Sequence, residues 1–470
     1  MTLLDWLRID RGATGTREGC AEGDCGACTV VLRRVKRGVV VNEPMNACIL
    51  LAGQAHGAEV LTVEDIGDVG GQSAALHPVQ EAMVRHHGSQ CGFCTPGIVM
   101  SLYALYQEAA RPVSRADVCD QLAGNLCRCT GYRPIIDAAL EACAVPPVEQ
   151  AVASADSLGA ITDEQDVFCG DEEAFFAAPR TEEALATLLA RYPDALILGG
   201  ATDAGLWVTK GLMAPRRVIW LGRVRDLDRI ERNATELAIG ATATVADAAR
   251  ELATLAPDVG EIVRRFGSAQ VRASATVGGN IANGSPIGDL APCLIALGAM
   301  IELAQGAALR TLALEDFFIA YKKQDRRPGE YVRRVLIPLP GNTLDFRAYK
   351  ISKRMDEDIS AVLGAFAIEL DGRCIVSARI AFGGMAGTPL RARQTEQQMP
   401  GIELDDRNSW QIALDTLVSE FAPLSDHRAS AAYRCLVARN LLEKALIELA
   451  GVPLAQTRIR AFVGATHAAK

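Results

Sequence analysis

The distribution of cysteine is the feature of this chain that most restricts its fold. The sequence has 14 cysteines, and nine of them lie before residue 130. Disulfides are rare in reducing compartments, where clustered cysteines usually bind metal. We therefore predict that the first 130 residues fold around metal centres.

The first cysteine set has the spacing of an iron–sulfur loop. Cys20, Cys25 and Cys28 follow the pattern Cys-x4-Cys-x2-Cys, and Cys48 supplies a fourth thiolate. This spacing is typical of plant-type [2Fe–2S] clusters, in which backbone N–H groups of a glycine-rich loop point at the sulfur atoms. A structural zinc site is the alternative, but zinc ribbons pair two Cys-x2-Cys knuckles and only one is present in this set.

A second cysteine set follows. Cys91 and Cys94 form a Cys-x2-Cys pair, and Cys127 and Cys129 form a Cys-x-Cys pair. Either pair alone is weak evidence, but Cys-x-Cys is unusual for zinc and the chain already carries the first set. The two pairs together predict a second [2Fe–2S] cluster. The other six cysteines lack ligand spacing and are interpreted as buried thiols.

Composition excludes several classes of protein. The chain has 470 residues, a length that corresponds to about three domains, and 49% of its residues are hydrophobic. The formal net charge of −9 argues against nucleic acid or an anionic membrane surface as partner. We see neither an apolar run of about 18 residues for a membrane-spanning helix nor a signal peptide, and we expect a cytoplasmic protein.

Hydrophobic periodicity gives a coarse arrangement of elements. Residues 28–32 are β-like and predict a strand that starts at Cys28. Apolar spacing predicts helices over 77–84 and 97–105, with Pro78 and Pro96 in first turns, where proline is tolerated. Later in the chain, strand-like and helical runs alternate, which indicates an α+β or α/β arrangement. The expected elements there are strands over 195–198, 217–221, 359–368 and 374–382, and a helix over 181–191.

Two loops of small residues resemble anion-binding loops without matching a standard nucleotide motif. They span 197–204 and 276–280, and neither contains GxGxxG or GxxxxGK. Each offers successive backbone N–H groups that side chains do not shield, as a pyrophosphate requires. Asp289 stands where it could cap a helix that begins at Leu290. From the residues alone, glycines at a strand-to-turn junction are more often structural.

Three strings together carry a family resemblance. EGCAEGDCGAC (18–28), QCGFCTPG (90–97) and GNLCRCTGY (124–132) resemble the molybdenum hydroxylase (xanthine oxidase) family. Within it, the chain is similar to the small subunit of bacterial xanthine dehydrogenases over nearly its whole length. The resemblance implies a multidomain α+β protein with a β-grasp ferredoxin domain, a four-helix domain, an FAD domain of the vanillyl-alcohol-oxidase type and a C-terminal α+β domain. The expected ranges are 1–62, 68–145, a linker over 146–170, 171–345 and 346–470.

The start of the chain departs from the family pattern. Family members usually have a β-hairpin ahead of the segment that matches residues 3–7, but only 19 residues precede Cys20. We therefore expect a truncated β-grasp domain with an exposed sheet edge and a weakened shell around the first cluster. A misassigned start codon is the explanation that we favour.

The resemblance also implies cofactor ligands. The two loops would hold the diphosphate and ribityl parts of FAD, Asp289 would bind a hydroxyl, Phe266 would pack on the adenine, and Lys350 would lie near the isoalloxazine. The implied FAD-binding residues are Ile197, Leu198, Gly199, Gly200, Ala201, Thr202, Asp203, Ala204, Phe266, Thr276, Val277, Gly278, Gly279, Asn280, Asp289 and Lys350. Tyr321 and Asp358 would lie near NAD, with a solvated charged turn as an equal alternative. Without the resemblance, Phe266 is a core aromatic and Lys350 a surface charge.

The implied function is an electron relay with no catalytic residue on this chain. Substrate hydroxylation would occur at a molybdopterin centre on a separate large subunit, with two copies of each subunit. Electrons would pass through the second cluster, the first cluster and FAD to NAD, and the fusion of the iron–sulfur and FAD parts favours xanthine as substrate. The alternatives are another substrate (an aldehyde, nicotinate or another purine) or a free-standing electron carrier.

Overall fold

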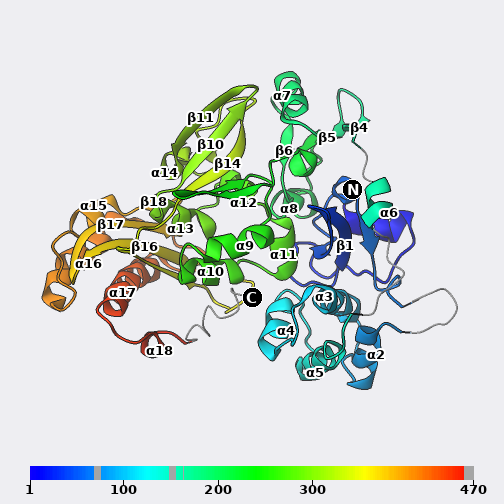
Figure 1. Ribbon diagram of the computed structural model, residues 1–470, viewed down its shortest axis with the longest axis horizontal. Coiled ribbons are helices and arrows are strands. Elements are labelled where there is room, and N and C mark those ends of the chain that lie inside the picture. Colours follow the sequence, from blue (N-terminus) through cyan, green and yellow to red (C-terminus); the bar gives the residue numbers. More distant parts are fainter. Residues whose placement is uncertain (68–75, 148–154, 162–163, 460–470) are drawn as a thin grey trace. The chain divides into compact units, whose positions relative to one another are not determined.

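The computed structural model of the chain describes residues 1–67, 76–147, 155–161 and 164–459 (Figure 1). These residues form two compact units, and each is described by itself. Unit 1 contains 1–188, 194–225 and 267–275, and unit 2 contains 189–193, 226–266 and the residues from 276 onward. The predicted linker includes 148–154 and 162–163, which lie outside the described residues. A short helix, α6 (Ala155–Ala160), lies between those two stretches.

Unit 1 begins with a three-stranded antiparallel sheet of order β2-β1-β3. Strand β1 (Thr29–Lys36) starts directly after Cys28, which confirms the predicted strand, and it pairs with β2 (Val39–Asn46) and β3 (Glu59–Leu61). The β1–β2 turn uses Arg37 and Gly38, both with positive φ, as a tight hairpin requires. The short elements of this part are α1 (Leu3–Asp5), η1 (Trp6–Asp10) and η2 (Ala52–Ala55).

Four helices follow in unit 1. They are α2 (Pro78–Arg85), α3 (Thr95–Glu108), α4 (Arg115–Gln121) and α5 (Arg133–Ala142). Pro78 and Pro96 lie in first turns, as predicted. Helix α3 is buried on almost every side from Gly97 to Tyr106, as is typical of a helix at the centre of a bundle.

The last part of unit 1 is a four-stranded sheet of order β4-β5-β7-β6. Its strands β5, β7 and β6 are parallel neighbours, while β4 pairs antiparallel. The strands are β4 (Val167–Gly170), β5 (Phe175–Ala178), β6 (Leu196–Leu198) and β7 (Arg217–Trp220). Its helical segments are α7 (Glu182–Arg191), α8 (Ala204–Thr209), η3 (Leu221–Arg223) and α11 (Ala269–Ser274). The predicted strands and helix between 181 and 221 are confirmed.

Unit 2 contains a five-stranded antiparallel sheet of order β11-β10-β14-β9-β8. The strands are β8 (Ile230–Arg232), β9 (Glu236–Gly240), β10 (Met300–Gln305), β11 (Ala308–Ala313) and β14 (Tyr331–Pro338). Its helices are α9 (Val245–Ala253), α10 (Pro257–Arg264), α12 (Val277–Asn283), α13 (Leu290–Ala296) and α14 (Leu314–Phe317), and a small hairpin joins β12 (Phe318–Ala320) to β13 (Lys323–Gln324).

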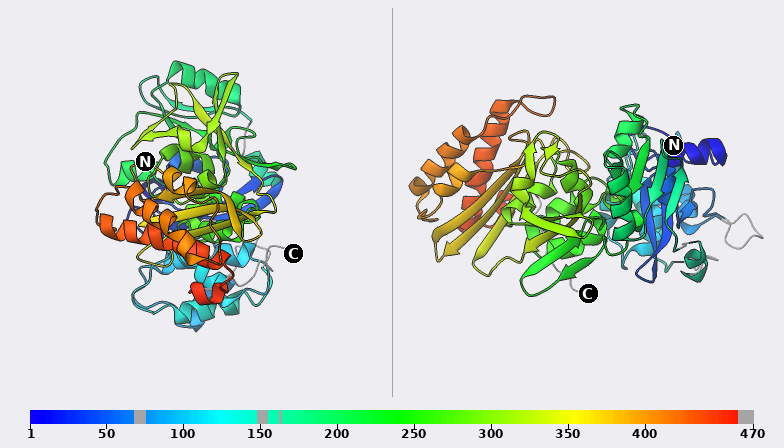
Figure 2. Two further views of the ribbon diagram at one scale, coloured as in Figure 1. Left: turned by 90° about the vertical axis from the view of Figure 1, so that its left-hand side faces the viewer. Right: turned by 90° about the horizontal axis from the view of Figure 1, so that it is seen from above.

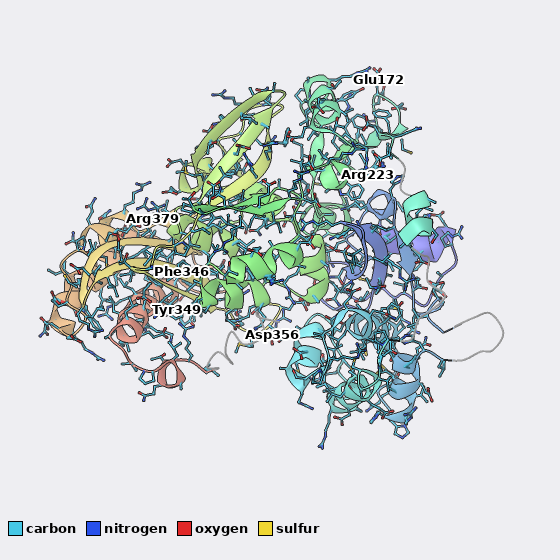
Figure 3. All side chains as sticks on the ribbon, in the orientation of Figure 1. Glu172, Arg223, Phe346, Tyr349, Asp356 and Arg379 are labelled. Atoms are coloured by element: carbon cyan, nitrogen blue, oxygen red, sulfur yellow. The ribbon has the colours of Figure 1, made fainter. Side chains whose placement is uncertain are left out.

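A second sheet of unit 2 has the order β15-β16-β17-β18, and helices α16 and α17 lie on one of its faces (Figure 2). Tyr349 and Phe346 lie on β15 (Figure 3), and the Tyr349 ring contacts Phe366 of β16. The elements are β15 (Leu344–Ile351), β16 (Val362–Asp371), β17 (Cys374–Gly383), β18 (Leu390–Arg391), α15 (Arg393–Gln397), η4 (Arg407–Trp410), α16 (Gln411–Glu420), α17 (Ala431–Leu449) and α18 (Leu454–Thr457).

The predicted strand over 374–382 is confirmed as β17, while β16 starts three residues later than predicted. The mixed α+β fold class is confirmed. Among the described residues, no helix combines the length and the apolar composition needed to cross a membrane.

Candidate redox cofactor sites

Three cysteines of the first set lie in the loop ahead of β1, and the fourth, Cys48, lies just after β2. Cys28 and Cys48 are buried, while Cys20 and Cys25 are half-buried. The Cys20 Sγ accepts the N–H groups of Glu22 and Cys25, each at 3.4 Å. The Cys25 and Cys48 side chains lie beside Cys20, and the Cys28 side chain lies beside Cys48.

The contacts among these thiols shift their pKa values in opposite directions. Hydrogen bonds from Cys25 and Cys48 hold the pKa of Cys20 far below its usual range. The same contacts with Cys20 raise the pKa of Cys25 and of Cys48. Thiols gathered in this way are a donor set for a cationic group, since bound metal deprotonates its thiol ligands outright.

Glycine is required where the loop turns. Gly23 and Gly26 have φ of +78° and +66°, a region that other residues rarely adopt. A Cβ on Gly26 would lie 2.1 Å from the carbonyl oxygen of Gly124, which precedes the second cysteine set. The two ligand loops therefore approach each other too closely for any side chain at this position.

The second cysteine set lies at the starts of two helices. Cys94 is the residue before α3, and Cys127 and Cys129 lie shortly before α5. The thiols lie in two pairs, Cys91 beside Cys129 and Cys94 beside Cys127. Burial and the contact with Cys127 raise the pKa of Cys94 to about 12.

A tyrosine fixes the loop around Cys127. The Tyr132 hydroxyl accepts the Cys127 N–H at 2.7 Å and donates to the Asn125 carbonyl at 3.1 Å. Thr130 Oγ1 lies 3.1 Å from Cys127 Sγ. Sequence reasoning did not assign Tyr132 or Thr130 a role, although both lie inside the 124–132 string.

The donor chemistry fits [2Fe–2S] clusters. Each set offers four thiols, and in the second set they form two pairs, which suits a cluster with two irons.

The first small-residue loop, 197–204, lies in unit 1 between β6 and α8. Gly200 packs so tightly that a Cβ would lie 1.7 Å from the Ser274 carbonyl oxygen, and Ala201 adopts a left-handed φ of +64°. Within the described part of the chain, the backbone N–H groups of 200–203 donate no hydrogen bond. This loop therefore has the unshielded N–H groups that the sequence predicts.

The second loop, 276–280, lies in unit 2 and differs from the prediction. Val277 and Gly278 donate their N–H groups to the carbonyls of Ala243 and Ala241, at 2.9 and 3.0 Å. The next two N–H groups bond to Thr276, through its Oγ1 and its carbonyl oxygen. The expectation that these N–H groups are open to a pyrophosphate is wrong, because they start helix α12 and hold it against the 241–243 segment. The Asn280 Oδ1 is buried and has no hydrogen-bond partner among the described residues.

Asp289 and Lys350 are brought together inside unit 2. Lys350 Nζ lies 2.6 Å from Asp289 Oδ2 and donates to the Arg265 carbonyl at 3.0 Å. Ser360 Oγ donates to Asp289 Oδ1 at 2.5 Å. Asp289 does precede α13, but its side chain makes no capping bond, so the capping expectation is wrong: Lys350 and Ser360 bind the carboxylate instead. Lys350 is buried, which also corrects its interpretation as a surface charge.

The remaining predicted residues are less enclosed. Phe266 is half-buried, and Tyr321 is 62% exposed with Lys322 over its ring. Asp358 accepts the N–H groups of Arg354 and Ile359, so it orders its own turn.

The six other cysteines were expected to be buried. Of these, Cys143 and Cys293 are buried, whereas Cys119 and Cys169 are exposed and Cys374 and Cys435 are half-buried. The expectation is therefore wrong for four of them, because thiols without a ligand role are also tolerated at exposed and half-buried positions of this protein.

Three family models match the chain. They are described as the FAD binding domain in molybdopterin dehydrogenase over 171–340, the [2Fe-2S] binding domain over 62–140 and the CO dehydrogenase flavoprotein C-terminal domain over 347–449. These matches define the class: an iron–sulfur protein that also carries an FAD-binding domain.

Curated relatives cover most of the chain. Xanthine dehydrogenase 1 of Arabidopsis thaliana is 30% identical over an alignment of 503 positions, which covers 90% of this chain and 36% of that protein. Xanthine dehydrogenase of Drosophila pseudoobscura pseudoobscura is 32% identical over an alignment of 512 positions, which covers 95% of this chain and 38% of that protein. The chain thus spans little more than a third of the length of these relatives.

Solved structures show the same fold. A chain of the Cu,Mo-CO dehydrogenase in its cyanide-inactivated form is 27% identical, with a TM-score of 0.54, and the match covers 58% of this chain and 96% of that one. A chain of quinoline 2-oxidoreductase from Pseudomonas putida 86 has a TM-score of 0.55 at 24% identity, covering 60% and 98%. Together with the family models, these findings show that the chain belongs to the molybdenum hydroxylase family and corresponds to its iron–sulfur and FAD-binding part.

Proposed function

We propose that this chain is the electron-transfer part of a molybdenum hydroxylase and binds two [2Fe–2S] clusters and FAD. The observation that carries the proposal is the convergence of two four-cysteine sets whose loops are hydrogen-bonded to each other. The Leu126 N–H, next to Cys127, donates to the Cys25 carbonyl oxygen at 3.0 Å. When bound, the clusters carry single electrons and FAD collects two of them, which it can release as a hydride.

The chain's own residues would position these groups. Cys20, Cys25, Cys28 and Cys48 would ligate one cluster, and the second set would ligate the other. Cys91 and Cys129 are exposed, which supports electron entry at the second cluster from a partner subunit. We propose a molybdopterin-binding large subunit as that partner, with two copies of each subunit.

The residues that we propose to contact FAD are assigned from the geometry of each unit by itself. In unit 1, the free N–H groups of 200–203 suit a diphosphate. In unit 2, the unpartnered Asn280 Oδ1 would accept a hydrogen bond from the cofactor. Asp289 and Lys350 remain proposed flavin contacts, and Phe266 the proposed adenine contact. Tyr321 and Asp358 remain the proposed neighbours of NAD.

Xanthine is the substrate that we propose, with NAD as acceptor and the cytoplasm as compartment. The curated relatives that support xanthine are about 30% identical. Another substrate is the second candidate, because the structural neighbours act, by their names, on carbon monoxide and quinoline.

The test is elemental and flavin analysis of the natively purified complex. We expect about four irons and one FAD per chain, with molybdenum on a co-purifying subunit and xanthine-dependent reduction of NAD. Cys127→Ser should remove about two irons, whereas the matched control Cys169→Ser, at an exposed cysteine outside both sets, should remove none. Zinc in place of iron would overturn the proposal, and iron without molybdenum would leave only a free-standing carrier. Turnover of another heterocycle or an aldehyde but not xanthine would overturn the substrate assignment.

A further inference from the structure

A small group of buried polar side chains connects the two ligand loops of unit 1. Thr29, Ser101, Asn125 and Gln270, here called the amide cluster, are each at most 1% exposed. They come from four separate segments: the start of β1, the middle of α3, the loop before Cys127, and α11. Buried polar groups from distant segments are costly unless they bond to one another, so their arrangement has to be specific.

Gln270 is the donor at the centre of the amide cluster. Its Nε2 lies 2.9 Å from Asn125 Oδ1, 2.9 Å from Ser101 Oγ and 3.1 Å from Thr29 Oγ1. The Ser101 hydroxyl donates to Asn125 Oδ1 at 2.6 Å, and the Thr29 hydroxyl donates to the Gly26 carbonyl at 2.7 Å. Since both hydroxyls already donate elsewhere, each acts as an acceptor toward the Gln270 NH2 group, which fixes the orientation of that amide. Thr29 Oγ1 also accepts from Asn125 Nδ2, at 3.3 Å.

Two of the four residues lie close to a cluster ligand in the chain. Thr29 follows Cys28 directly, and Asn125 is two residues before Cys127. The Asn125 Nδ2 also donates to the Gly26 carbonyl, at 3.1 Å, inside the first ligand loop. The amide cluster therefore bonds to both loops at the point where Leu126 donates to Cys25.

Stability alone does not explain Gln270. Its Oε1 is buried and has no hydrogen-bond partner among the described residues. A buried oxygen without a donor is unfavourable, and an apolar side chain of similar size would avoid that cost. The role of the amide therefore lies in its NH2 group, which holds the Asn125, Ser101 and Thr29 side chains in position.

We propose that Gln270 is a positioning residue that fixes the separation and electronic coupling of the two [2Fe–2S] clusters, through Asn125, Ser101 and Thr29. The inference rests on the proposed function, because it requires both clusters. Without Gln270, Asn125 Oδ1 loses one of the two groups that donate to it. The loop that carries Cys127 is then held against the first ligand loop less firmly.

The experiment uses the natively purified complex with Gln270→Leu, which keeps the volume and removes the donor. Iron content and the visible spectrum first establish that wild type and variant hold both clusters. Electron paramagnetic resonance of the fully reduced protein then measures the magnetic interaction between the clusters, and rapid-reaction spectroscopy measures electron transfer between them. We expect a severalfold weaker interaction and a severalfold slower transfer at unchanged iron content.

Two further variants keep the test decisive. Gln80→Leu removes another glutamine of unit 1, whose Nε2 donates to the Val63 carbonyl at 3.1 Å, and should change neither signal. Ser101→Ala removes one donor to Asn125 and should weaken the coupling in the same direction, which decides the matter if Gln270→Leu loses iron. Full coupling in a variant that holds both clusters would overturn the inference, whereas a wild-type protein without iron would instead overturn the proposed function.

Discussion

The ammonium group of Lys350 lies 2.6 Å from the Asp289 carboxylate, although 61 residues separate them in the chain. Both side chains are almost completely buried, with 2% and 8% of their surface exposed. A buried ion pair is a poor source of stability by itself, but removal of one partner leaves a charge without compensation. The pair is therefore sensitive to single substitutions.

Lys350→Met should destabilise unit 2 strongly. We expect the free energy of unfolding to fall by about 3–5 kcal/mol, because Asp289 keeps only the Ser360 hydroxyl as partner. Urea unfolding measures the effect. Arg393→Met, which breaks the exposed pair with Asp316, is the control and should cost at most about 1 kcal/mol. Equal losses in the two variants would contradict the assignment of a buried pair, and Asp289→Asn added to Lys350→Met should restore much of the loss.

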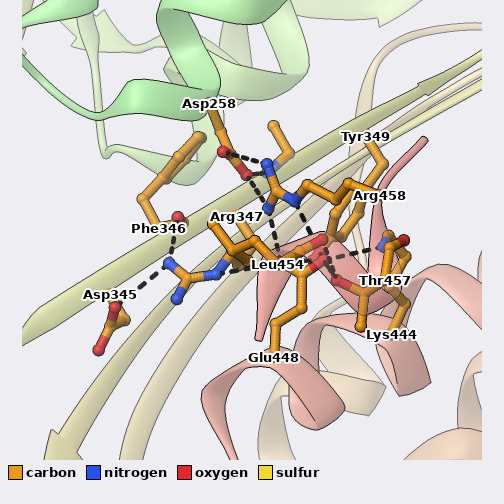
Figure 4. Close-up of polar contacts among 11 residues, drawn as sticks. Asp258, Asp345, Phe346, Arg347, Tyr349, Lys444, Glu448, Leu454, Thr457 and Arg458 are labelled. Carbon is orange, nitrogen blue, oxygen red and sulfur yellow. Dashed lines mark hydrogen bonds and ion pairs between the residues drawn. The ribbon is translucent and has the colours of Figure 1, made fainter. Parts of the chain in front are cut away.

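A second buried carboxylate predicts a pH dependence. Arg458 lies between Asp258 and Glu448 in unit 2 (Figure 4), 2.5 Å from Glu448 Oε2 and 2.7 Å from Asp258 Oδ1. Burial alone would raise the pKa of Glu448, but hydrogen bonds from Arg458, Lys444 and Thr457 lower it from 4.5 to about 2.

The direction of this pH dependence follows from the linkage between protonation and folding. A carboxylate with a lowered pKa stabilises the fold fully above pH 4.5, its ordinary pKa, and loses that contribution as the pH falls to about 2. Glu448→Gln should therefore lower the free energy of unfolding at pH 7 by on the order of 3 kcal/mol, with the difference from wild type shrinking toward pH 2. Denaturant unfolding at several pH values measures this, and a difference that stays constant between pH 7 and pH 2 would refute it.

Gly26→Ala should disrupt both ligand loops. The added Cβ would meet the Gly124 carbonyl oxygen at 2.1 Å, so the two loops must separate. We expect the iron content to fall by at least one cluster, about two irons per chain. Gly38→Ala is the matched control: its φ is also positive, at +79°, but nothing lies within 4 Å, so it should cost only about 1–2 kcal/mol of strain and no iron. Full iron content in Gly26→Ala would show that the loops tolerate a wider separation.

Ala201→Gly should be neutral or stabilising. Ala201 has a φ of +64°, where glycine avoids about 1–2 kcal/mol of strain and costs up to about 1 kcal/mol in the unfolded state. Ala186→Gly, inside helix α7, should instead cost about 1 kcal/mol. Thermal unfolding of the two variants measures the difference, and a loss at position 201 as large as that at 186 would refute the strained conformation.

The sequence alone determined the features that depend on short spacing. The short cysteine motifs 20–28, 91–94 and 127–129 are defined by neighbours a few residues apart. The strand after Cys28 and the first-turn prolines Pro78 and Pro96 follow from local propensity. The mixed α+β class follows from the same local patterns together with the family resemblance. These predictions hold because local backbone geometry is largely independent of the rest of the chain.

Only the tertiary structure decided which polar groups find each other. Asp289 was expected to cap a helix, yet its carboxylate bonds to Lys350 and Ser360; the N–H groups of 276–280 were expected to be free, yet distant carbonyls accept two of them. Gln270 gave no signal in the sequence, because its partners Asn125 and Thr29 lie 145 and 241 residues away. A buried donor bonds to whichever acceptor packing brings near, and the sequence states the donor but not that acceptor.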